Sequence, residues 1–310
     1  MTAIGRSDVE AARERIAGYV RRTPVLDLGE RAFGPPGRIT LKLELTQHTG
    51  SFKPRGAFSK MLASEVPASG VLAASGGNFG LAVAYAAHTL GHRAEIYVPS
   101  TSPKVKADRI AALGAEVRIV EGRYDEALEA STVRARETDA LVMHAYDQPE
   151  VVAGQGTIGA ELVEQVPDAE TVLVAIGGGG LVGGVAAWYE GRTRVIGVEP
   201  EATRCMFAAL EAGHPVDVSY GGYAADSLGA RRAGGIAFEV VSRHVERVVL
   251  VPDDAIRDAQ RRLWESVRIF AEPGGATSFA ALLCGAYVPE ADEHVVALIC
   301  GANGDLAAIA

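Results

Sequence analysis

The sequence predicts an α/β protein whose β-sheets are mostly parallel and are covered by helices on both faces. Two observations carry this prediction. Short apolar runs alternate with helical patterns along most of the chain, which is typical of parallel strands joined by helical crossovers. The chain has 310 residues, of which 48% are hydrophobic. This is enough apolar material for one large domain or two medium ones.

The first expected element is a helix that begins at Ser7, because Ser7-Asp8-Val9-Glu10 has the spacing of a capping box. Its apolar face consists of Val9, Ala12, Ile16 and Val20. An alternating strand follows at 39–45. Further strands are expected at 71–74, 94–98, 115–120, 141–144, 171–176, 194–198, 247–251 and 294–300. Helices are expected at 81–90, from Ser102-Pro103 to Gly114, and at 124–137, 181–189 and 254–268.

Composition and charge exclude several classes of function. The formal net charge is -9 and no basic run stands out, so we expect no nucleic-acid partner. Cys205, Cys284 and Cys300 form no CxxC pair, which argues against a zinc site and a disulfide framework. The segment 1–10 lacks an apolar signal-peptide core, and no apolar run reaches the length of a membrane span. We therefore expect a cytoplasmic protein with no membrane contact.

Lys53 is the most informative residue for chemistry. It lies in Thr49-Gly50-Ser51-Phe52-Lys53-Pro54-Arg55-Gly56-Ala57, shortly after the strand expected at 39–45. A lysine amine becomes a good nucleophile when it is desolvated, and it can then hold an aldehyde cofactor as a Schiff base. A single lysine is weak evidence, so the argument depends on further motifs.

Four glycines, Gly177 to Gly180, follow an apolar strand and precede a helix that opens at Leu181. Free backbone N–H groups and the helix dipole make such a loop suitable for a phosphate. A tight strand-to-helix turn is the structural alternative. The loop lacks the Lys-Ser/Thr that follows the glycines of a Walker motif.

Ser75-Gly76-Gly77-Asn78 also joins an expected strand to an expected helix. Its N–H groups could hold a carboxylate, and the Asn78 amide could bind a phenolate oxygen. An ordinary helix N-cap at Ser75 or Asn78 explains the same residues equally well. Two further segments, Glu272-Pro273-Gly274-Gly275-Ala276 and Cys300-Gly301-Ala302-Asn303-Gly304, complete the set.

In this order, the motifs resemble those of the fold-type II pyridoxal phosphate enzymes, in the serine/threonine dehydratase and serine racemase branch. The resemblance covers nearly the whole chain. It implies a tryptophan synthase beta-like fold with a small domain at 46–146, inserted into a large domain made of 1–45 and 147–310. It places pyridoxal phosphate in the cleft between them, and it implies a homodimer, the usual state of the family.

The resemblance also assigns roles to individual residues. Lys53 would carry the cofactor and Gly177 to Gly180 with Leu181 would bind its phosphate. Asn78 would contact the cofactor's 3-oxygen, and Ser75, Gly76, Gly77 and Asn78 would bind the substrate carboxylate. Phe52 would cover the pyridine ring, Glu272 would lie beside it and Cys300 would face its nitrogen. Packing in the core is the alternative for Phe52 and for Cys300.

Glu199 matches a residue that ligates a cation in some relatives. Thr203 and Cys205 occupy the other ligand positions, and Cys205 replaces the aspartate of magnesium-binding relatives. We therefore expect no divalent metal, and Glu199 stays a candidate ligand for a monovalent cation.

The residue at position 76 separates elimination from racemisation. Racemisation needs a second proton donor on the substrate face opposite the lysine, and serine racemases carry a serine at the position of Gly76. Because Gly76 has no side chain, we predict a lyase. Lys53 would remove the Cα proton and Ser75 would assist at the catalytic site. The β-hydroxyl would leave, and a 2-oxo acid and ammonia would form.

Three alternatives stay open. They are an amino acid racemase that uses water or Ser75 as the second acid, a β-replacement synthase, and a non-catalytic binding protein. Retention of Lys53 argues against the last. Serine, threonine, 3-hydroxyaspartate and phenylserine all carry the same leaving group, so the sequence does not select among them. Phe79 and the 219–227 segment, with Tyr223, are candidates for lining the substrate pocket.

Overall fold

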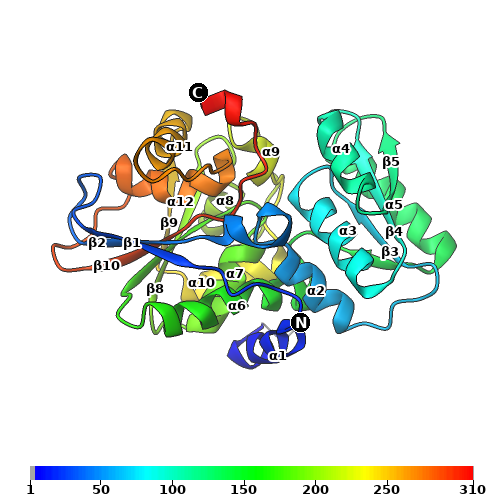
Figure 1. Ribbon diagram of the computed structural model, residues 1–310, viewed down its shortest axis with the longest axis horizontal. Coiled ribbons are helices and arrows are strands. Elements are labelled where there is room, and N and C mark those ends of the chain that lie inside the picture. Colours follow the sequence, from blue (N-terminus) through cyan, green and yellow to red (C-terminus); the bar gives the residue numbers. More distant parts are fainter. Residues whose placement is uncertain (1–3, 310) are drawn as a thin grey trace.

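The computed structural model describes residues 4–309 and contains two β-sheets, each with helices on both faces (Figure 1). The larger sheet has six strands in the order β1-β2-β10-β7-β8-β9, and the smaller has four in the order β5-β4-β3-β6. Among the described strands, only β1 and β2 pair antiparallel. The predicted α/β fold with mostly parallel sheets is therefore confirmed.

The strands of the larger sheet are β1 (Val25–Glu30), β2 (Arg38–Lys42), β7 (Thr171–Ala175), β8 (Arg194–Pro200), β9 (Arg247–Val251) and β10 (His294–Leu298). Helices α11 (Asp253–Val267) and α12 (Pro273–Leu283) lie on one face of this sheet, and α6 (Pro149–Gln165), α7 (Gly180–Tyr189) and α10 (Gly235–His244) lie on the other (Figure 1). The remaining helices of this part are α1 (Arg6–Ile16), α8 (Cys205–Ala212) and α9 (Ala225–Leu228).

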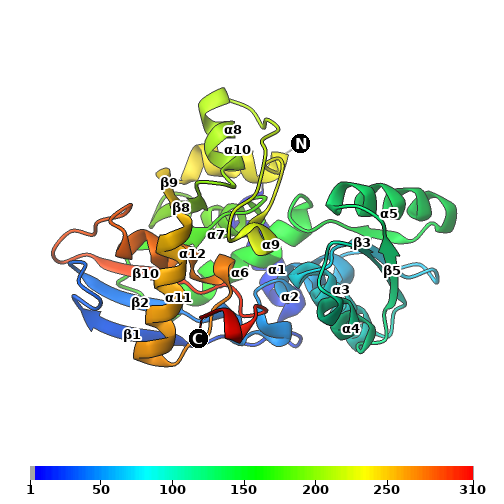
Figure 2. The same ribbon diagram turned by 90° about the horizontal axis from the view of Figure 1, so that it is seen from above.

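The smaller sheet consists of β3 (Val71–Ala74), β4 (Ala94–Pro99), β5 (Glu116–Val120) and β6 (Leu141–Met143). Helices α3 (Asn78–Leu90) and α4 (Lys104–Ala111) cover one face, and α5 (Tyr124–Thr138) covers the other (Figure 2). Helix α2 (Pro54–Leu62) packs against both α3 and α6, and so joins the two parts of the molecule. All four strands come from within 46–146, although the exact domain boundaries stay a prediction.

The central strands are buried on both faces, which explains why they read as continuous apolar runs rather than as alternating ones. Every residue of β7 and β10 is buried. At the edge of the smaller sheet, β5 exposes Glu116, Arg118 and Ile119 instead. The strands therefore fix a rigid frame whose carboxyl ends carry the connecting loops.

Two predicted boundaries were wrong. Helix α1 begins at Arg6 rather than Ser7, because Gly5 is the N-cap and its N–H donates to the Asp8 carboxylate at 2.9 Å. The strand expected at 39–45 ends at Lys42, and a 3₁₀ turn at Glu44–Thr46 turns Glu44 into the interior. Strand β1 was not predicted, because its partly exposed residues lack a clear alternation. The other expected elements are present with ends shifted by a few residues.

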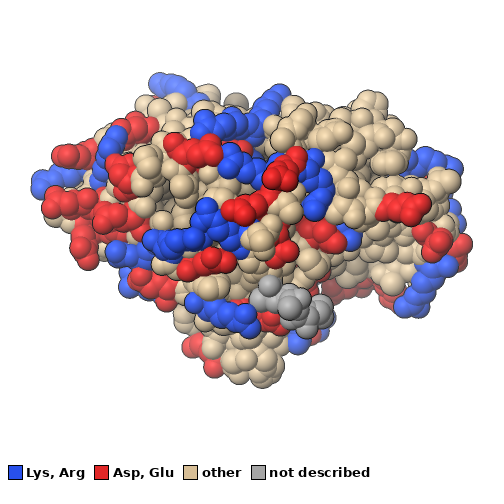
Figure 3. Space-filling view, turned by 90° about the horizontal axis from the view of Figure 1, so that it is seen from below, with Lys and Arg blue, Asp and Glu red and all other residues tan. Residues whose placement is uncertain are grey.

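No described helix has both the length and the apolar character needed to cross a membrane. On the face shown in Figure 3, acidic and basic side chains are intermixed over the surface.

Candidate active site

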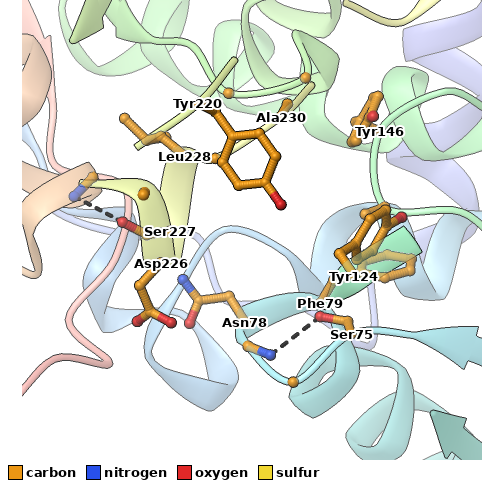
Figure 4. A pocket seen from close by; sticks show the side chains of 18 of the residues that line it. Ser75, Asn78, Phe79, Tyr124, Tyr146, Tyr220, Asp226, Ser227, Leu228 and Ala230 are labelled. Atoms are coloured by element: carbon orange, nitrogen blue, oxygen red, sulfur yellow. Dashed lines mark hydrogen bonds between the residues drawn. The ribbon is translucent and has the colours of Figure 1, made fainter. Parts of the chain in front are cut away.

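A cavity of about 670 Å³ lies between the two sheets, where the carboxyl ends of strands from both sheets meet. Ser75 follows β3, Gly177 follows β7 and Cys300 follows β10, and all three line the cavity (Figure 4 shows its interior). Ligands in open α/β folds bind at this edge of the sheet. The cavity is thus lined from both sheets, and its description as a cleft between two domains stays a prediction.

The structure brings the predicted cofactor and substrate residues to this one cavity. The lining residues among them are Phe52, Lys53, Ser75, Gly76, Gly77, Asn78, Gly177, Gly178, Gly179, Gly180, Leu181, Glu272 and Cys300. Their individual roles stay predictions. Glu199 does not line the cavity.

Lys53 reaches the cavity from the residue before α2, whose first position is Pro54. Proline suits this first position because it has no N–H to satisfy. The Lys53 Nζ donates to the Ala145 carbonyl at 3.1 Å and lies 5.0 Å from the Phe52 ring centre and 5.6 Å from that of Phe79. Burial lowers the pKa of Lys53 to about 8, although Cys300 and Glu272 act in the opposite direction. The amine is therefore poised to act as a nucleophile or base near neutral pH.

The lowered pKa provides a test of the predicted bond between Lys53 and pyridoxal phosphate. Only the neutral amine attacks an aldehyde, so the uptake rate should rise about tenfold per pH unit up to about pH 8 and then level off. Stopped-flow absorption measures the uptake rate between pH 6 and 10, in steps of about half a pH unit. Nα-acetyl-lysine, whose amine has an ordinary pKa, serves as the reference and should still gain rate at the top of the range. An uptake rate that keeps rising in parallel with the reference would contradict a lowered pKa.

The glycine loop presents free backbone donors to the cavity. Within residues 4–309, the N–H groups of 177–181 have no hydrogen-bond partner, whereas the carbonyls of Gly177 and Gly178 accept from Cys205 Sγ and from Gly234 N–H. Gly179 has φ +97°, and a Cβ at Gly178 would lie 2.4 Å from the Tyr146 ring. Side chains are therefore excluded from this loop. Free donors at the start of α7 fit a phosphate group.

Asn78 is held by a chain of hydrogen bonds that crosses the cleft. Its Nδ2 donates to Glu272 at 2.5 Å, and its Oδ1 accepts from Asn303 Nδ2 at 2.8 Å. Asn303 in turn accepts from Arg109 at 2.8 Å. Burial raises the pKa of Glu272 to about 7, partly offset by the bond from Asn78. These contacts hold the Asn78 amide in place. Glu272 accepts one of the two N–H groups of that amide and leaves the other unused.

Cys300 and Phe52 are linked through the backbone, because the Phe52 N–H donates to the Cys300 carbonyl at 3.1 Å. The Cys300 thiol donates to the Gly274 carbonyl at 3.4 Å. Burial raises the pKa of Cys300 well above its ordinary value. The side chain is therefore a neutral thiol. A pyridine nitrogen that faces it would have no negatively charged partner.

The serine-glycine loop has little free space. The Ser75 hydroxyl accepts from the Gly77 N–H at 3.2 Å. A Cβ at Gly76 would lie 2.1 Å from the Ser102 Oγ and 2.7 Å from the Ser102 Cβ. No side chain fits at position 76 while Ser102 keeps its place.

Glu199 has a structural role that the sequence did not reveal. Its two carboxylate oxygens accept the N–H groups of Met206 and Phe207 at 2.9 and 2.8 Å, at the start of α8. Burial raises the pKa of Glu199 to about 8, against these two bonds. Among the described residues, no cluster of three His, Cys, Asp or Glu side chains could hold a metal.

Sequence reasoning missed several residues of the cavity. Tyr124, Tyr146 and Ser102 line it. The 219–227 segment, considered as a lining segment, does contribute, through Tyr220 among others. Tyr223, considered as a lining residue, faces away, because its hydroxyl donates to Gln260 at 2.7 Å and its ring lies under Arg257. Phe79 lines the cavity, as considered. No local pattern marks Tyr124 or Tyr146, since they come from two separate connections.

The site fits pyridoxal phosphate on three independent counts: an amine of lowered pKa, a loop of free N–H donors, and a neutral thiol. The comparisons with known proteins agree. Residues 16–301 match the family described as "Pyridoxal-phosphate dependent enzyme". The chain is 37% identical over 305 residues to the L-threonine ammonia-lyase of Thermotoga maritima, covering 96% of this chain and 75% of that protein.

A second relative and a solved structure indicate the same family. The chain is 36% identical over 309 residues to the phenylserine dehydratase of Ralstonia pickettii, covering 98% of this chain and 94% of that protein. Its structure superposes on maize serine racemase with a TM-score of 0.93 at 31% identity, covering 99% of this chain and 96% of the other.

The chain therefore belongs to the pyridoxal phosphate-dependent enzymes of fold type II, and pyridoxal phosphate is its cofactor. Its similarity to both dehydratases and a racemase confirms the branch that the sequence motifs indicated.

Proposed function

We propose that the protein is an ammonia-lyase that converts a β-hydroxy amino acid into a 2-oxo acid and ammonia. L-Serine, L-threonine and 3-hydroxylated relatives are the substrate class. The dehydratase relatives support this reaction. The single observation that favours elimination over racemisation is the crowding at Gly76, where the Ser102 side chain occupies the space that a side chain at position 76 would need.

Bound pyridoxal phosphate would supply the electron sink for negative charge that develops at the substrate Cα. The chain's own residues do the rest. The Lys53 Nζ takes the Cα proton, which its lowered pKa permits near neutral pH. The N–H groups of the 75–77 loop and the Ser75 hydroxyl hold the carboxylate. Gly177 to Gly180 hold the phosphate, and the Cys300 thiol faces the ring nitrogen without a negative charge.

A visible absorption spectrum of the purified protein with pyridoxal phosphate tests the function. L-Serine and then L-threonine are added in the same cuvette, with a coupled assay for 2-oxo acid. A cofactor band that shifts while oxo acid accumulates supports the lyase. A shift without oxo acid points to a racemase or a β-replacement synthase, which chiral analysis and an added sulfide nucleophile would separate. No band at all would overturn the assignment of Lys53.

A serine introduced at position 76 is expected to impair the enzyme rather than create a racemase. In Gly76→Ser the new Cβ meets Ser102, so the loop must shift. We expect a loss of stability of about 1–3 kcal/mol, as for other overpacked sites, and no gain in D-serine from L-serine. Chiral chromatography and thermal unfolding measure both effects.

The double variant Gly76→Ser/Ser102→Gly removes the clash and is the matched control. Its stability should return toward that of the parent protein. Rapid interconversion of L- and D-serine by Gly76→Ser alone would show that Ser102 leaves room after all.

The family resemblance further supports a homodimer in the cytoplasm, a monovalent cation near Glu199, and a small domain at 46–146. Light scattering tests the dimer, and activity in potassium, sodium and tetramethylammonium buffers tests the cation.

A further inference from the structure

We propose that the cavity contains a subsite for an aromatic ring on the substrate Cβ, so that the preferred substrates are 3-aryl-3-hydroxy amino acids. This inference rests on the proposed lyase function and narrows its substrate class.

Three tyrosines from separate connections line the same space. Tyr124 begins α5, Tyr146 follows β6 and Tyr220 precedes α9. Figure 4 shows the Tyr220 ring projecting into the cavity, with its hydroxyl directed toward the side occupied by Tyr124 and Ser75. The rings of Tyr220 and Tyr146 each pack against a glycine. A Cβ at Gly229 would lie 3.0 Å from Tyr220, and one at Gly178 would lie 2.4 Å from Tyr146.

Tyr124 and Tyr220 both line the cavity, and the described part of the chain uses neither of their hydroxyls. Within residues 4–309, neither hydroxyl has a hydrogen-bond partner. Burial raises the pKa of Tyr124 to about 12, with further contributions from Asp125 and Tyr220. The two rings thus offer aromatic faces and edges, together with two unpaired hydroxyls, to whatever enters.

The charges around the cavity do not match a second substrate carboxylate. Arg231 pairs with Asp217 at 3.2 Å and with Asp125 at 3.6 Å, and Arg232 pairs with Asp217 at 3.0 Å. Both arginines are more than half exposed, at 57% and 54%, and so lie at the rim. Arg123, the third arginine of the described lining, has no ion-pair partner among the described residues but is exposed as well. Among the described lining residues, Lys53 is the cation that lies inside the cavity. The proposed reaction already uses Lys53, so it is not available to a second carboxylate.

Apolar side chains complete the wall. Leu128 and Leu228 line the cavity beside the tyrosines, as does Phe79. A methyl or hydrogen on the substrate Cβ would leave these surfaces without contacts. An aromatic ring would contact them edge-to-face or offset, in the arrangement that aromatic pairs favour, and would remove its own apolar surface from water.

Binding can be tested separately from catalysis with amino acids that have no β-hydroxyl to lose. The absorption band of the holoenzyme is titrated with L-phenylalanine and with L-alanine. We expect L-phenylalanine to bind about tenfold more tightly or better, from the burial of its ring. Turnover is then compared for L-threo-3-phenylserine, L-threonine and L-threo-3-hydroxyaspartate, and kcat/KM should be highest for phenylserine.

Variants connect the preference to Tyr220. Tyr220→Ala should lower the ratio of kcat/KM for phenylserine over threonine by about threefold to tenfold, the range that one aromatic contact supports. Tyr220→Phe retains the ring and should keep the ratio. Tyr223→Phe is the matched control, because Tyr223 lies in the same segment but faces Gln260 outside the cavity.

The outcomes separate the two proposals. Turnover of threonine with no preference for L-phenylalanine over L-alanine overturns the aromatic subsite and leaves the lyase intact. A preference for hydroxyaspartate also overturns the subsite. Tighter binding of L-phenylalanine without oxo acid from any substrate supports the subsite and overturns the lyase.

Discussion

Lys53→Ala is expected to abolish the cofactor absorption band and to lower the rate of 2-oxo acid formation by at least about 10³-fold. In the proposed mechanism Lys53 is both the amine that carries the cofactor and the base that takes the Cα proton, so the variant loses both, and a positioned base alone contributes on the order of 10²–10⁴-fold. The structure supports both roles, because the Lys53 Nζ lies in the cavity beside Phe52 and Phe79 with a pKa lowered to about 8 by burial.

The comparison variant for this experiment is Lys104→Ala. The Lys104 side chain is 87% exposed and pairs only with Asp108 on its own helix, so its removal should leave spectrum and rate unchanged. Far-ultraviolet circular dichroism of both variants shows whether the fold is retained. A Lys53→Ala protein that keeps a shifted cofactor band and turns over substrate within about tenfold of the parent would refute the assignment.

Arg55→Leu is expected to cost about 3–5 kcal/mol of unfolding free energy, because it leaves buried acidic groups without their partner. The Arg55 side chain is fully buried in α2, two residues after Lys53. Its guanidinium donates to both oxygens of Glu44 at 2.9 and 2.8 Å and to Glu161 at 2.7 Å. Lys42 completes the network with a contact of 2.6 Å to Glu161.

The network joins parts of the chain that are distant in sequence. Glu44 follows β2, Arg55 belongs to α2 and Glu161 belongs to α6. Burial alone would raise the pKa of Glu44, but the charge and hydrogen bonds of Arg55 outweigh it and hold the pKa below its ordinary value. Because Arg55 anchors the start of α2, its loss should also disturb the position of Lys53.

Urea unfolding of the apo-protein measures the effect. Arg118→Leu is the exposed comparison, since the Arg118 side chain is about half exposed and exposed pairs are worth about 0–1 kcal/mol. Of its two partners, Glu116 is also half exposed, and the more buried Glu95 keeps Arg134. The double variant Arg55→Leu/Glu44→Leu should recover part of the stability by removing the orphaned charge. A loss below about 1 kcal/mol in Arg55→Leu would show that the buried charges find other partners or water.

Much of the fold could be predicted from the sequence because its central strands are fully buried. Every residue of β7 and β10 is buried, so these segments read as apolar runs wherever they occur. The predicted ends of strands and helices were wrong where a side chain contacts a residue that is distant in the sequence. The strand expected at 39–45 ends early because Glu44 turns inward toward Arg55. Strand β1 is an edge strand without a clear alternation.

The candidate site divides in the same way. The lysine, the two glycine loops, Asn78, Glu272 and Cys300 each carry a local motif, and through the family resemblance the sequence predicted that they share one site. The structure brings them to one cavity, and their individual roles toward pyridoxal phosphate stay predictions. Only the tertiary structure placed Tyr124, Tyr146 and Ser102 around the same cavity, and only it showed that Tyr220 rather than Tyr223 of the 219–227 segment faces that cavity. Glycine loops and helix starts can be predicted from a short stretch of sequence, because the backbone conformation there depends on neighbouring residues. A pocket wall is assembled from side chains of separate loops, and the folding of both sheets decides which of them meet.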